Sequence, residues 1–244
     1  MTDNTRLAII TGGSRGLGRA LCEQFLARGY QVIEFSRTAP HAYSVRVDLA
    51  SPEACRAAVA KAIASVELET LQELVVVNNA GTLDPIGASS QKPPAAVLAN
   101  LNINFTSAIM VLTELTAKFQ SAPCRKVLAN ISSGAALKVY AGWSLYCASK
   151  AGMEAYIRAL AVEQEAEPHP FTAININPGV IDTEMQAMIR AASSADFPEV
   201  ERFIQRKQQG GLAAPADVAA AVLRIVALPS LFGGGRFDTN VDGS

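Results

Sequence analysis

Short apolar runs rich in β-branched residues alternate along the chain with longer stretches of helical periodicity. The apolar runs predict strands at 7–11, 31–35, 44–47, 74–78, 126–131 and 172–176. The longer stretches are rich in Ala, Leu and Glu, are bounded by Gly, Pro or Ser, and predict helices at 17–28, 53–66, 96–119 and 149–164. Strands that alternate with helices in this way are typical of a parallel sheet.

Repeated βαβ units of this kind predict one α/β domain over residues 1–244. The expected architecture is a Rossmann-type doubly wound parallel sheet with helices on both faces, whose ligand crevice lies beyond the carboxyl ends of the strands. Residues 182–211 are polar and irregular in pattern, and we expect them to form a mobile flap over a site.

Composition narrows the function classes. The chain has 244 residues, 50% of them hydrophobic, which is enough for one core, and its formal net charge of -1 without like-charged blocks predicts small-molecule partners rather than nucleic acid or a membrane. Four scattered cysteines without a CxxC pair, and only two histidines, argue against a metal site or a disulfide framework. The polar N-terminal residues and the lack of a run of about 18 apolar residues favour a cytoplasmic protein.

The first predicted strand ends in a glycine-rich turn, TGGSRGLG at 11–18, and a helix follows directly. Small residues and free N–H groups at a helix N-terminus suit a pyrophosphate. A P-loop is disfavoured because Arg19 and Ala20 stand where Lys and Ser or Thr are needed, and Leu21 breaks the strict GxGxxG pattern. The turn therefore predicts a dinucleotide site.

The residues after the second strand bear on which dinucleotide binds. Ser36 occupies the position where an acidic residue would bind the ribose of NAD, and Arg37 and Arg15 are suited to pair with a 2′-phosphate. NADP(H) is therefore the expected cofactor. The alternative is that both arginines are solvated and that Glu34 is the ribose acid. Asp48 and Leu49, after the third strand, are expected to flank the adenine.

Tyr146 and Lys150 are four residues apart, so a helix places them on one face. An ammonium beside a phenol favours the phenolate and moves the phenol pKa from about 10 towards neutrality. Ser133 ends the fifth predicted strand and is suited to hold a substrate oxygen. Asn104, inside a predicted helix without a capping role, is a candidate for holding a water.

These motifs together resemble the short-chain dehydrogenase/reductase family. The resemblance rests on TGxxxGxG at 11–18, NNAG at 78–81, Asn104, Ser133, Tyr146-x-x-x-Lys150 and Pro178-Gly179, and it covers nearly the whole chain. It implies that Tyr146 donates a proton to a carbonyl, Ser133 orients that carbonyl, Lys150 also binds the nicotinamide ribose, and Asn104 anchors a relay water. The expected cofactor contacts are Gly12, Ser14, Arg15, Gly16, Leu17, Gly18, Ser36, Arg37, Asp48, Leu49, Asn79, Ala80, Gly81, Tyr146, Lys150, Pro178, Gly179, Ile181 and Thr183.

A closer likeness is to the sepiapterin reductase branch of that family, through NISS at 130–133, GWSLYCASK at 142–150 and DTEMQ at 182–186. It implies an NADPH-dependent carbonyl reductase that acts on a pterin side-chain ketone or another vicinal dicarbonyl. Bacterial relatives resemble reductases of benzil-type diketones, which is the alternative main activity. The expected substrate contacts are Ser133, Trp143, Met185 and Asp238.

Several alternatives remain open from sequence. Asp238 is either a pterin anchor or a solvated acid in the C-terminal tail, and Trp143, Met185, Met188 and Phe197 form either an apolar pocket or ordinary core. A non-catalytic NADP-binding sensor has a different function on the same fold. A hydrolase with Ser133 as nucleophile lacks a GxSxG motif and needs His41 or His169. Family resemblance implies a homodimer or homotetramer.

Overall fold

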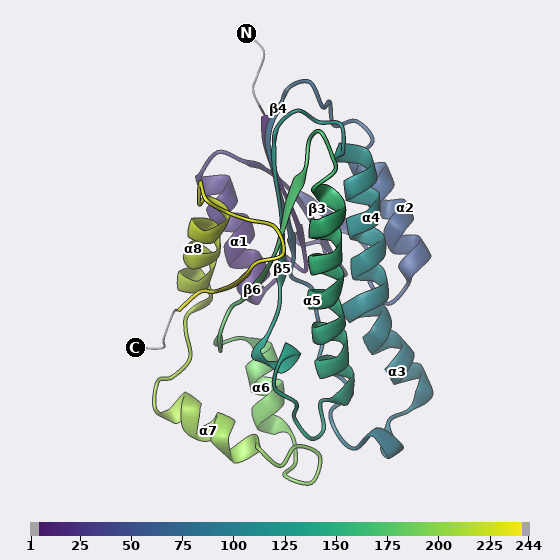
Figure 1. The fold of residues 1–244 in the computed structure, drawn as a ribbon. Helices are drawn as coiled ribbons and strands as arrows, with labels where there is room; N and C mark the ends of the chain where they lie inside the picture. Colours follow the sequence, from purple (N-terminus) through teal and green to yellow (C-terminus); the bar gives the residue numbers. More distant parts are fainter. Residues whose placement is uncertain (1–4, 241–244) are drawn as a thin grey trace.

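A computed structural model describes residues 5–240, which form a seven-stranded parallel sheet (Figure 1). The strands are β1 (Thr5–Thr11), β2 (Gln31–Ser36), β3 (Ser44–Arg46), β4 (Leu71–Asn78), β5 (Arg125–Ile131), β6 (Phe171–Asn177) and β7 (Arg236–Asp238). Their spatial order is β3-β2-β1-β4-β5-β6-β7. The chain therefore winds outwards in both directions from the neighbouring strands β1 and β4, as in a doubly wound fold.

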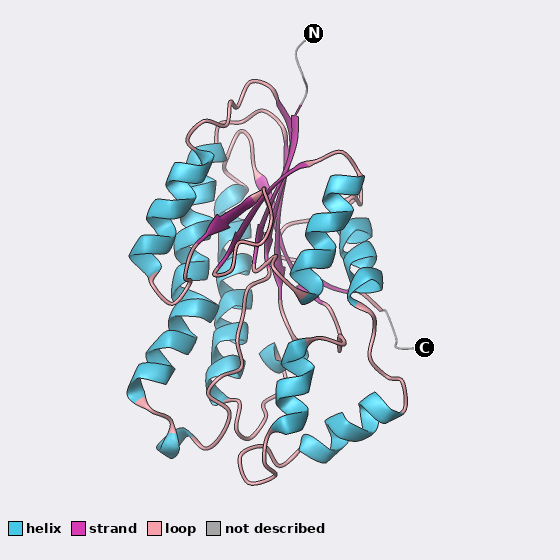
Figure 2. Cartoon of the chain, turned by 180° about the vertical axis from the view of Figure 1, so that it is seen from behind, coloured by secondary structure: helices cyan, strands magenta, loops and turns pink. Residues whose placement is uncertain are grey.

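Helices cover both faces of the sheet, as Figure 2 shows from behind. The helices are α1 (Gly16–Ala27), α2 (Pro52–Ile63), α3 (Pro94–Leu101), α4 (Ser107–Phe119), α5 (Ser144–Gln164), α6 (Glu184–Ala191), α7 (Val200–Gln208) and α8 (Pro215–Val226). Alternate residues of β1 supply the two cores: Ala8 and Ile10 pack in the cluster that includes α1 and α8, while Leu7 and Ile9 pack with α2, α4 and α5. This alternation explains why the strands read as continuous apolar runs.

The predicted fold class is confirmed, with local differences. Helix α5 begins at Ser144, five residues before the predicted start. The predicted helix 96–119 consists of α3 and α4 joined by a π-helical turn, Asn102–Thr106. Strand β7 and helix α8 were not predicted. β7 has only three residues and follows a run of glycines, so its own sequence does not indicate a strand. Its extended conformation depends on its pairing with β6.

The prediction that residues 182–211 are irregular is wrong, because they include the whole of helices α6 and α7. Both helices lie beyond the carboxyl ends of the strands (Figure 1). A bridge between Ile181 and Ala213 closes the base of this excursion, and the fully buried Phe197 anchors its middle. We call residues 182–211 the α6–α7 excursion.

The stretch Pro94–Phe119 is long and apolar enough to cross a membrane by length and composition alone. Core helices pass the same test, and the buried side chains of α4, including Val111, Leu112 and Phe119, pack in the domain core. Within residues 5–240 no group of three or more His, Cys, Asp or Glu residues is placed to hold a metal ion.

Candidate active site

A cavity of about 1010 Å³ lies at the carboxyl ends of the strands and reaches under the α6–α7 excursion. Its walls come from the turns that follow β1, β2, β4, β5 and β6, and from helices α5, α6 and α7. Every residue predicted to contact the cofactor lines this cavity. The point where winding reverses, between β1 and β4, is where ligands bind in doubly wound sheets.

The glycine-rich turn is packed too tightly to accept side chains. A Cβ on Gly18 would lie 2.1 Å from the carbonyl oxygen of Gly12, and Gly12 itself has φ +72°. Asn79 closes the turn from the next strand, since its Nδ2 donates to the carbonyl oxygens of Thr11 at 3.0 Å and Gly12 at 3.1 Å. The turn is therefore fixed by close backbone packing and by the Asn79 side chain, without side chains of its own that would fill the space for a ligand.

Helix α1 begins at Gly16 without a side-chain cap and without an acidic residue in its first turn. Its N-terminal N–H groups and its dipole are consequently available to an anion. The Gly16 backbone also lies close to Thr183 across the cavity, since a Cβ on Gly16 would be 3.2 Å from Thr183 Cγ2. These features fit the pyrophosphate of a dinucleotide.

The end of β2 bears on the choice of cofactor. Ser36 and Arg37 line the cavity. Glu34 does not belong to the lining among the described residues; it is fully buried, and its Oε1 accepts from the Gly13 N–H at 2.9 Å. The alternative in which Glu34 binds the ribose is therefore disfavoured, because that carboxylate supports the glycine-rich turn from beneath.

Ser133, Tyr146 and Lys150 meet at the same wall of the cavity. Ser133 lies just after β5 and accepts from the Ala135 N–H at 3.1 Å through its hydroxyl. Tyr146 and Lys150 lie on the buried face of α5, and the Lys150 ammonium donates to the Ile131 carbonyl oxygen at 2.7 Å. The segment just after β5 and the first turns of α5 thus bring Ser133, Tyr146 and Lys150 together.

The electrostatics of Tyr146 differ from the expectation. Burial raises the pKa of Tyr146 to about 12, and the hydrogen bond with Ser133 opposes that rise. The Lys150 ammonium lies 5.6 Å from the Tyr146 ring centroid, and burial lowers the pKa of Lys150 to about 8, opposed by Glu154. The predicted lowering of the Tyr146 pKa by Lys150 is therefore not found, because burial dominates and raises that pKa. The phenol is protonated at neutral pH, which suits a proton donor.

Asn104 lies in the π-helical turn between α3 and α4, a feature that often occurs at functional sites. Its Oδ1 accepts from the Thr82 N–H at 2.8 Å, and its Nδ2 donates to the Thr82 carbonyl oxygen at 2.8 Å. A Cβ on Gly81 would be 3.3 Å from Asn104 Oδ1 and 3.8 Å from Lys150 Nζ, so Gly81 lies between them. The side chain fixes the loop after β4; its role towards a water remains a prediction.

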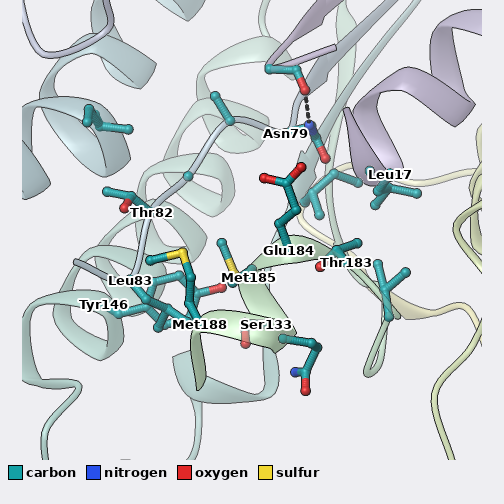
Figure 3. A pocket seen from close by; sticks show the side chains of 18 of the residues that line it. Leu17, Asn79, Thr82, Leu83, Ser133, Tyr146, Thr183, Glu184, Met185 and Met188 are labelled. Atoms are coloured by element: carbon teal, nitrogen blue, oxygen red, sulfur yellow. Dashed lines mark hydrogen bonds between the residues drawn. The ribbon is translucent and has the colours of Figure 1, made fainter. Parts of the chain in front are cut away.

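The far end of the cavity is apolar and aromatic. Of the residues predicted there, Trp143, Met185 and Met188 line the cavity, and Phe197 lies behind Trp143 with stacked rings 4.6 Å apart. Figure 3 shows Met185, Met188 and Leu83 in the same cavity as Ser133 and Tyr146. Sequence reasoning missed Leu83, Tyr140 and Phe203, which also line this end. Of these three, only Tyr140 could have been found from the sequence, because it is an aromatic residue three positions before the predicted pocket residue Trp143.

Asp238 is placed differently from the prediction that it contacts substrate. It is not among the described residues that line the cavity, and its carboxylate accepts from Asn177 Nδ2 at 2.6 Å and from Arg236 at 3.4 Å. Asn177 does line the cavity. Asp238 is therefore linked to the cavity through its hydrogen bond with Asn177, and it does not line the cavity itself.

Neither histidine joins Ser133. Within the described residues, His41 and His169 are absent from the lining of the cavity; His41 stacks on Tyr43, and His169 lies in the loop before β6. A hydrolase that uses Ser133 as nucleophile would need a base beside the hydroxyl. The geometry gives this alternative no support.

A doubly wound sheet, a glycine-rich turn and a Ser-Tyr-Lys group that share one cavity are the arrangement expected of an oxidoreductase. A family model described as short chain dehydrogenase matches residues 6–194. The chain belongs to the short-chain dehydrogenase family, whose oxidoreductases act on CH–OH and C=O groups.

Two kinds of curated relative are similar over most of their length. The chain is 35% identical over 225 residues to "Benzil reductase ((S)-benzoin forming)" of Bacillus subtilis (strain 168), covering 90% of this chain and 93% of that protein. It is 30% identical over 236 residues to "Sepiapterin reductase" of Xenopus tropicalis, with 88% of each chain covered.

Solved structures agree with the fold. The crystal structure of the KRED1-Pglu enzyme has a TM-score of 0.80 at 26% identity, covering 95% of this chain and 100% of that chain. A short chain dehydrogenase from Burkholderia cenocepacia J2315, in complex with NADP, has a TM-score of 0.75 at 25% identity and covers 100% of this chain and 98% of its own.

Proposed function

We propose that the protein is an NADPH-dependent carbonyl reductase whose main substrates are vicinal dicarbonyl compounds with aromatic groups. The observation that carries this proposal is the position of Ser133, Tyr146 and Lys150 beside an aromatic wall in one cavity. That arrangement presents a proton donor next to an apolar surface. A planar conjugated ketone is the kind of molecule that fits both.

The roles follow from the geometry. Tyr146 donates its hydroxyl proton to the substrate oxygen, and its high pKa keeps that proton in place at neutral pH. Ser133 orients the same oxygen by hydrogen bonding. Lys150 holds positive charge beside the reacting groups and is suited to bind a ribose hydroxyl. NADPH, when bound, supplies the hydride.

The choice of NADPH is supported by Arg15, Ser36 and Arg37, which all line the cavity. Arg15 pairs with Glu184 in this structure, and both side chains are more than half exposed, so the guanidinium can leave that partner for a phosphate. A related solved structure that contains NADP is consistent with the same choice.

Benzil-type diketones are favoured over pterins by the lining of the substrate end. Trp143, Met185 and Leu83 offer apolar contact. The predicted pterin anchor, Asp238, lies outside the described lining, with Asn177 between it and the cavity. Similarity to a benzil reductase at 35% identity points the same way. A pterin side-chain ketone remains the second candidate, because Asn177 links Asp238 to the site.

The decisive experiment compares benzil and sepiapterin as substrates, with oxidation of NADPH followed by its absorbance. We expect faster turnover of benzil. Tyr146→Phe should lower kcat by about 100- to 10,000-fold, the usual contribution of a positioned acid, while NADPH binding persists. Tyr156→Phe, on the same helix but bonded to Thr113, is the matched control and should keep full activity.

Unchanged turnover in Tyr146→Phe would contradict the proposed chemistry. Faster reduction of sepiapterin than of benzil would overturn the substrate preference and leave the chemistry intact. Tight NADPH binding without turnover of any carbonyl compound would instead support the non-catalytic sensor.

A further inference from the structure

An ion pair between a buried carboxylate and a partly buried guanidinium, which the proposed chemistry does not use, lies behind Ser133. Glu154, on α5, is 2% exposed. Its Oε1 accepts from the Ser132 hydroxyl at 2.5 Å and from Arg236 Nε at 2.9 Å. Arg236 belongs to β7, the strand at the edge of the sheet, 82 residues further along the chain.

The same guanidinium reaches the backbone of Ser133. Arg236 Nη2 donates to the Ser133 carbonyl oxygen at 3.3 Å, while Nη1 donates to the Asp238 carboxylate at 3.4 Å. Glu154 therefore holds the side chain of one serine, and Arg236 holds the main chain of the next. Both contacts converge on the short segment that presents the Ser133 hydroxyl to Tyr146.

Burying a carboxylate and a guanidinium is costly, and such a pair often contributes little net stability compared with apolar residues of the same size. The planar guanidinium of Arg236 bonds Glu154, Ser133 and Asp238 at once. It therefore fixes the relative positions of these three residues. Lysine, with one charged nitrogen, cannot reproduce this fork.

We infer that Glu154 and Arg236 form a positioning pair, which holds the Ser132–Ser133 segment so that the Ser133 hydroxyl meets Tyr146 and the substrate oxygen. The pair does not touch the reacting atoms, and it couples the edge strand β7 to the catalytic helix α5. This inference rests on the proposed function for its activity assay, but not for its spectroscopic test.

Glu154 and Arg236 also affect the pKa of Lys150. The Glu154 carboxylate raises the pKa of Lys150 against the effect of burial, four residues away on α5. Other titratable or charged groups around it are Tyr146 and Arg158 on α5, and Arg236 and Asp238 on β7. Removing Glu154 should therefore lower the pKa of Lys150. Removing Arg236 should raise it, because the carboxylate is then less neutralised.

The first test compares Arg236→Met with Arg158→Met. Arg158 lies 3.8 Å from the other oxygen of Glu154 and is more than half exposed, so it is a matched control on the same carboxylate. A misplacement of about 1 Å can cost about 100-fold in rate. We expect Arg236→Met to lower kcat by about 10- to 100-fold with unchanged NADPH affinity, and Arg236→Lys to recover part of the loss. Arg158→Met should lower kcat less than twofold.

The second test needs no substrate. The Lys150 ammonium is followed by NMR through a pH titration, assigned with Lys150→Arg. We expect its midpoint to move down in Glu154→Gln and up in Arg236→Met. A structural role alone would lower Tm without these opposite shifts.

Equal losses of kcat in Arg236→Met and Arg158→Met would overturn the inference, as would a lower Tm with normal kcat in Arg236→Met. If Glu154→Gln does not fold, Arg236→Met and Arg236→Lys decide the question. Should the wild type reduce ketones other than dicarbonyls, the proposed substrate class fails, and the same ratios measured on those ketones still test the pair.

Discussion

Arg37 follows the last residue of β2 and lines the cavity with an exposed side chain. Each hydrogen bond to a charged group is worth about 1.5–3 kcal/mol, or about 10- to 100-fold in affinity. We therefore expect Arg37→Ala to raise the Kd of NADPH by about 10- to 100-fold and to leave the Kd of NADH within twofold. Fluorescence titration of both cofactors measures the difference.

Arg28 provides the control for this charge change. It is an exposed arginine at the opposite end of α1, and its guanidinium bonds Gln24. Arg28→Ala should leave both affinities unchanged. Equal weakening of NADPH and NADH in Arg37→Ala, or tighter binding of NADH by the wild type, would contradict NADP preference.

At the level of elements, the α6–α7 excursion shapes the substrate end of the cavity. It is held by Phe197, which is fully buried and packs against Trp143, Tyr140 and Phe203. The turn at Gly142 also packs closely against the α6–α7 excursion, because a Cβ on Gly142 would lie 2.2 Å from the Asp196 carbonyl oxygen. Packing in this cluster thus determines where Met185 and Met188 stand.

Phe197→Ala should remove that anchor. Truncation of a buried phenylalanine costs about 3–5 kcal/mol, and a domain of this size loses about 2–4 °C of Tm per kcal/mol. We expect Tm to fall by at least about 6 °C and the KM for the carbonyl substrate to rise more than that for NADPH. Calorimetry and steady-state kinetics measure these effects.

Phe232→Ala is the matched control, since Phe232 is 62% exposed and its ring centroid lies 5.5 Å from that of Phe237. It should cost about 1 kcal/mol or less. Equal losses of Tm in the two variants would show that Phe197 does not anchor the α6–α7 excursion.

Features that depend on residues close together in the sequence could be predicted, whereas features built by residues far apart in the chain could not. The turn at 11–18 and the Tyr146–Lys150 pair could be predicted, because their function depends on spacing within one turn or helix. The α6–α7 excursion could not, because α6 has eight residues and α7 has nine, each helix buries only two of them, and a pattern this short does not indicate a helix. The link from Glu154 to Arg236 spans 82 residues, and no local pattern indicates it.

At the scale of the whole molecule, a ladder of buried amides crosses the sheet beneath the site. Asn78 Nδ2 donates to Asn130 Oδ1 at 2.9 Å, and Asn130 Nδ2 donates to Asn175 Oδ1 at 2.8 Å. The three residues are register partners on β4, β5 and β6. Thr11 joins one end of the ladder at 3.2 Å, and the Glu154 carbonyl oxygen joins the other at 3.4 Å.

The ladder connects the glycine-rich turn to the positioning pair. Thr11 Oγ1 also accepts from the N–H groups of Asn79 and Ala80, at the cofactor end, while Glu154 lies behind Ser133. Buried amides are costly unless every group is paired, so a satisfied chain of this kind specifies one register of the strands. It therefore fixes the glycine-rich turn and Ser133 relative to each other.

Asn130→Ala should break the ladder at its centre and leave Asn78 Nδ2 and Asn175 Oδ1 buried without their partners. Each unsatisfied group costs about 1–3 kcal/mol, which corresponds to a fall in Tm of about 4–24 °C for the two together. Asn102→Ala removes a single bond, to the Ala50 carbonyl oxygen, at a half-buried site and should cost about 1 kcal/mol. Because the ladder reaches both ends of the site, Asn130→Ala should also weaken NADPH binding and lower kcat, whereas Asn102→Ala should lower only Tm. Similar changes in Tm, NADPH affinity and kcat in the two variants would mean that the buried amides do not fix the register of the strands.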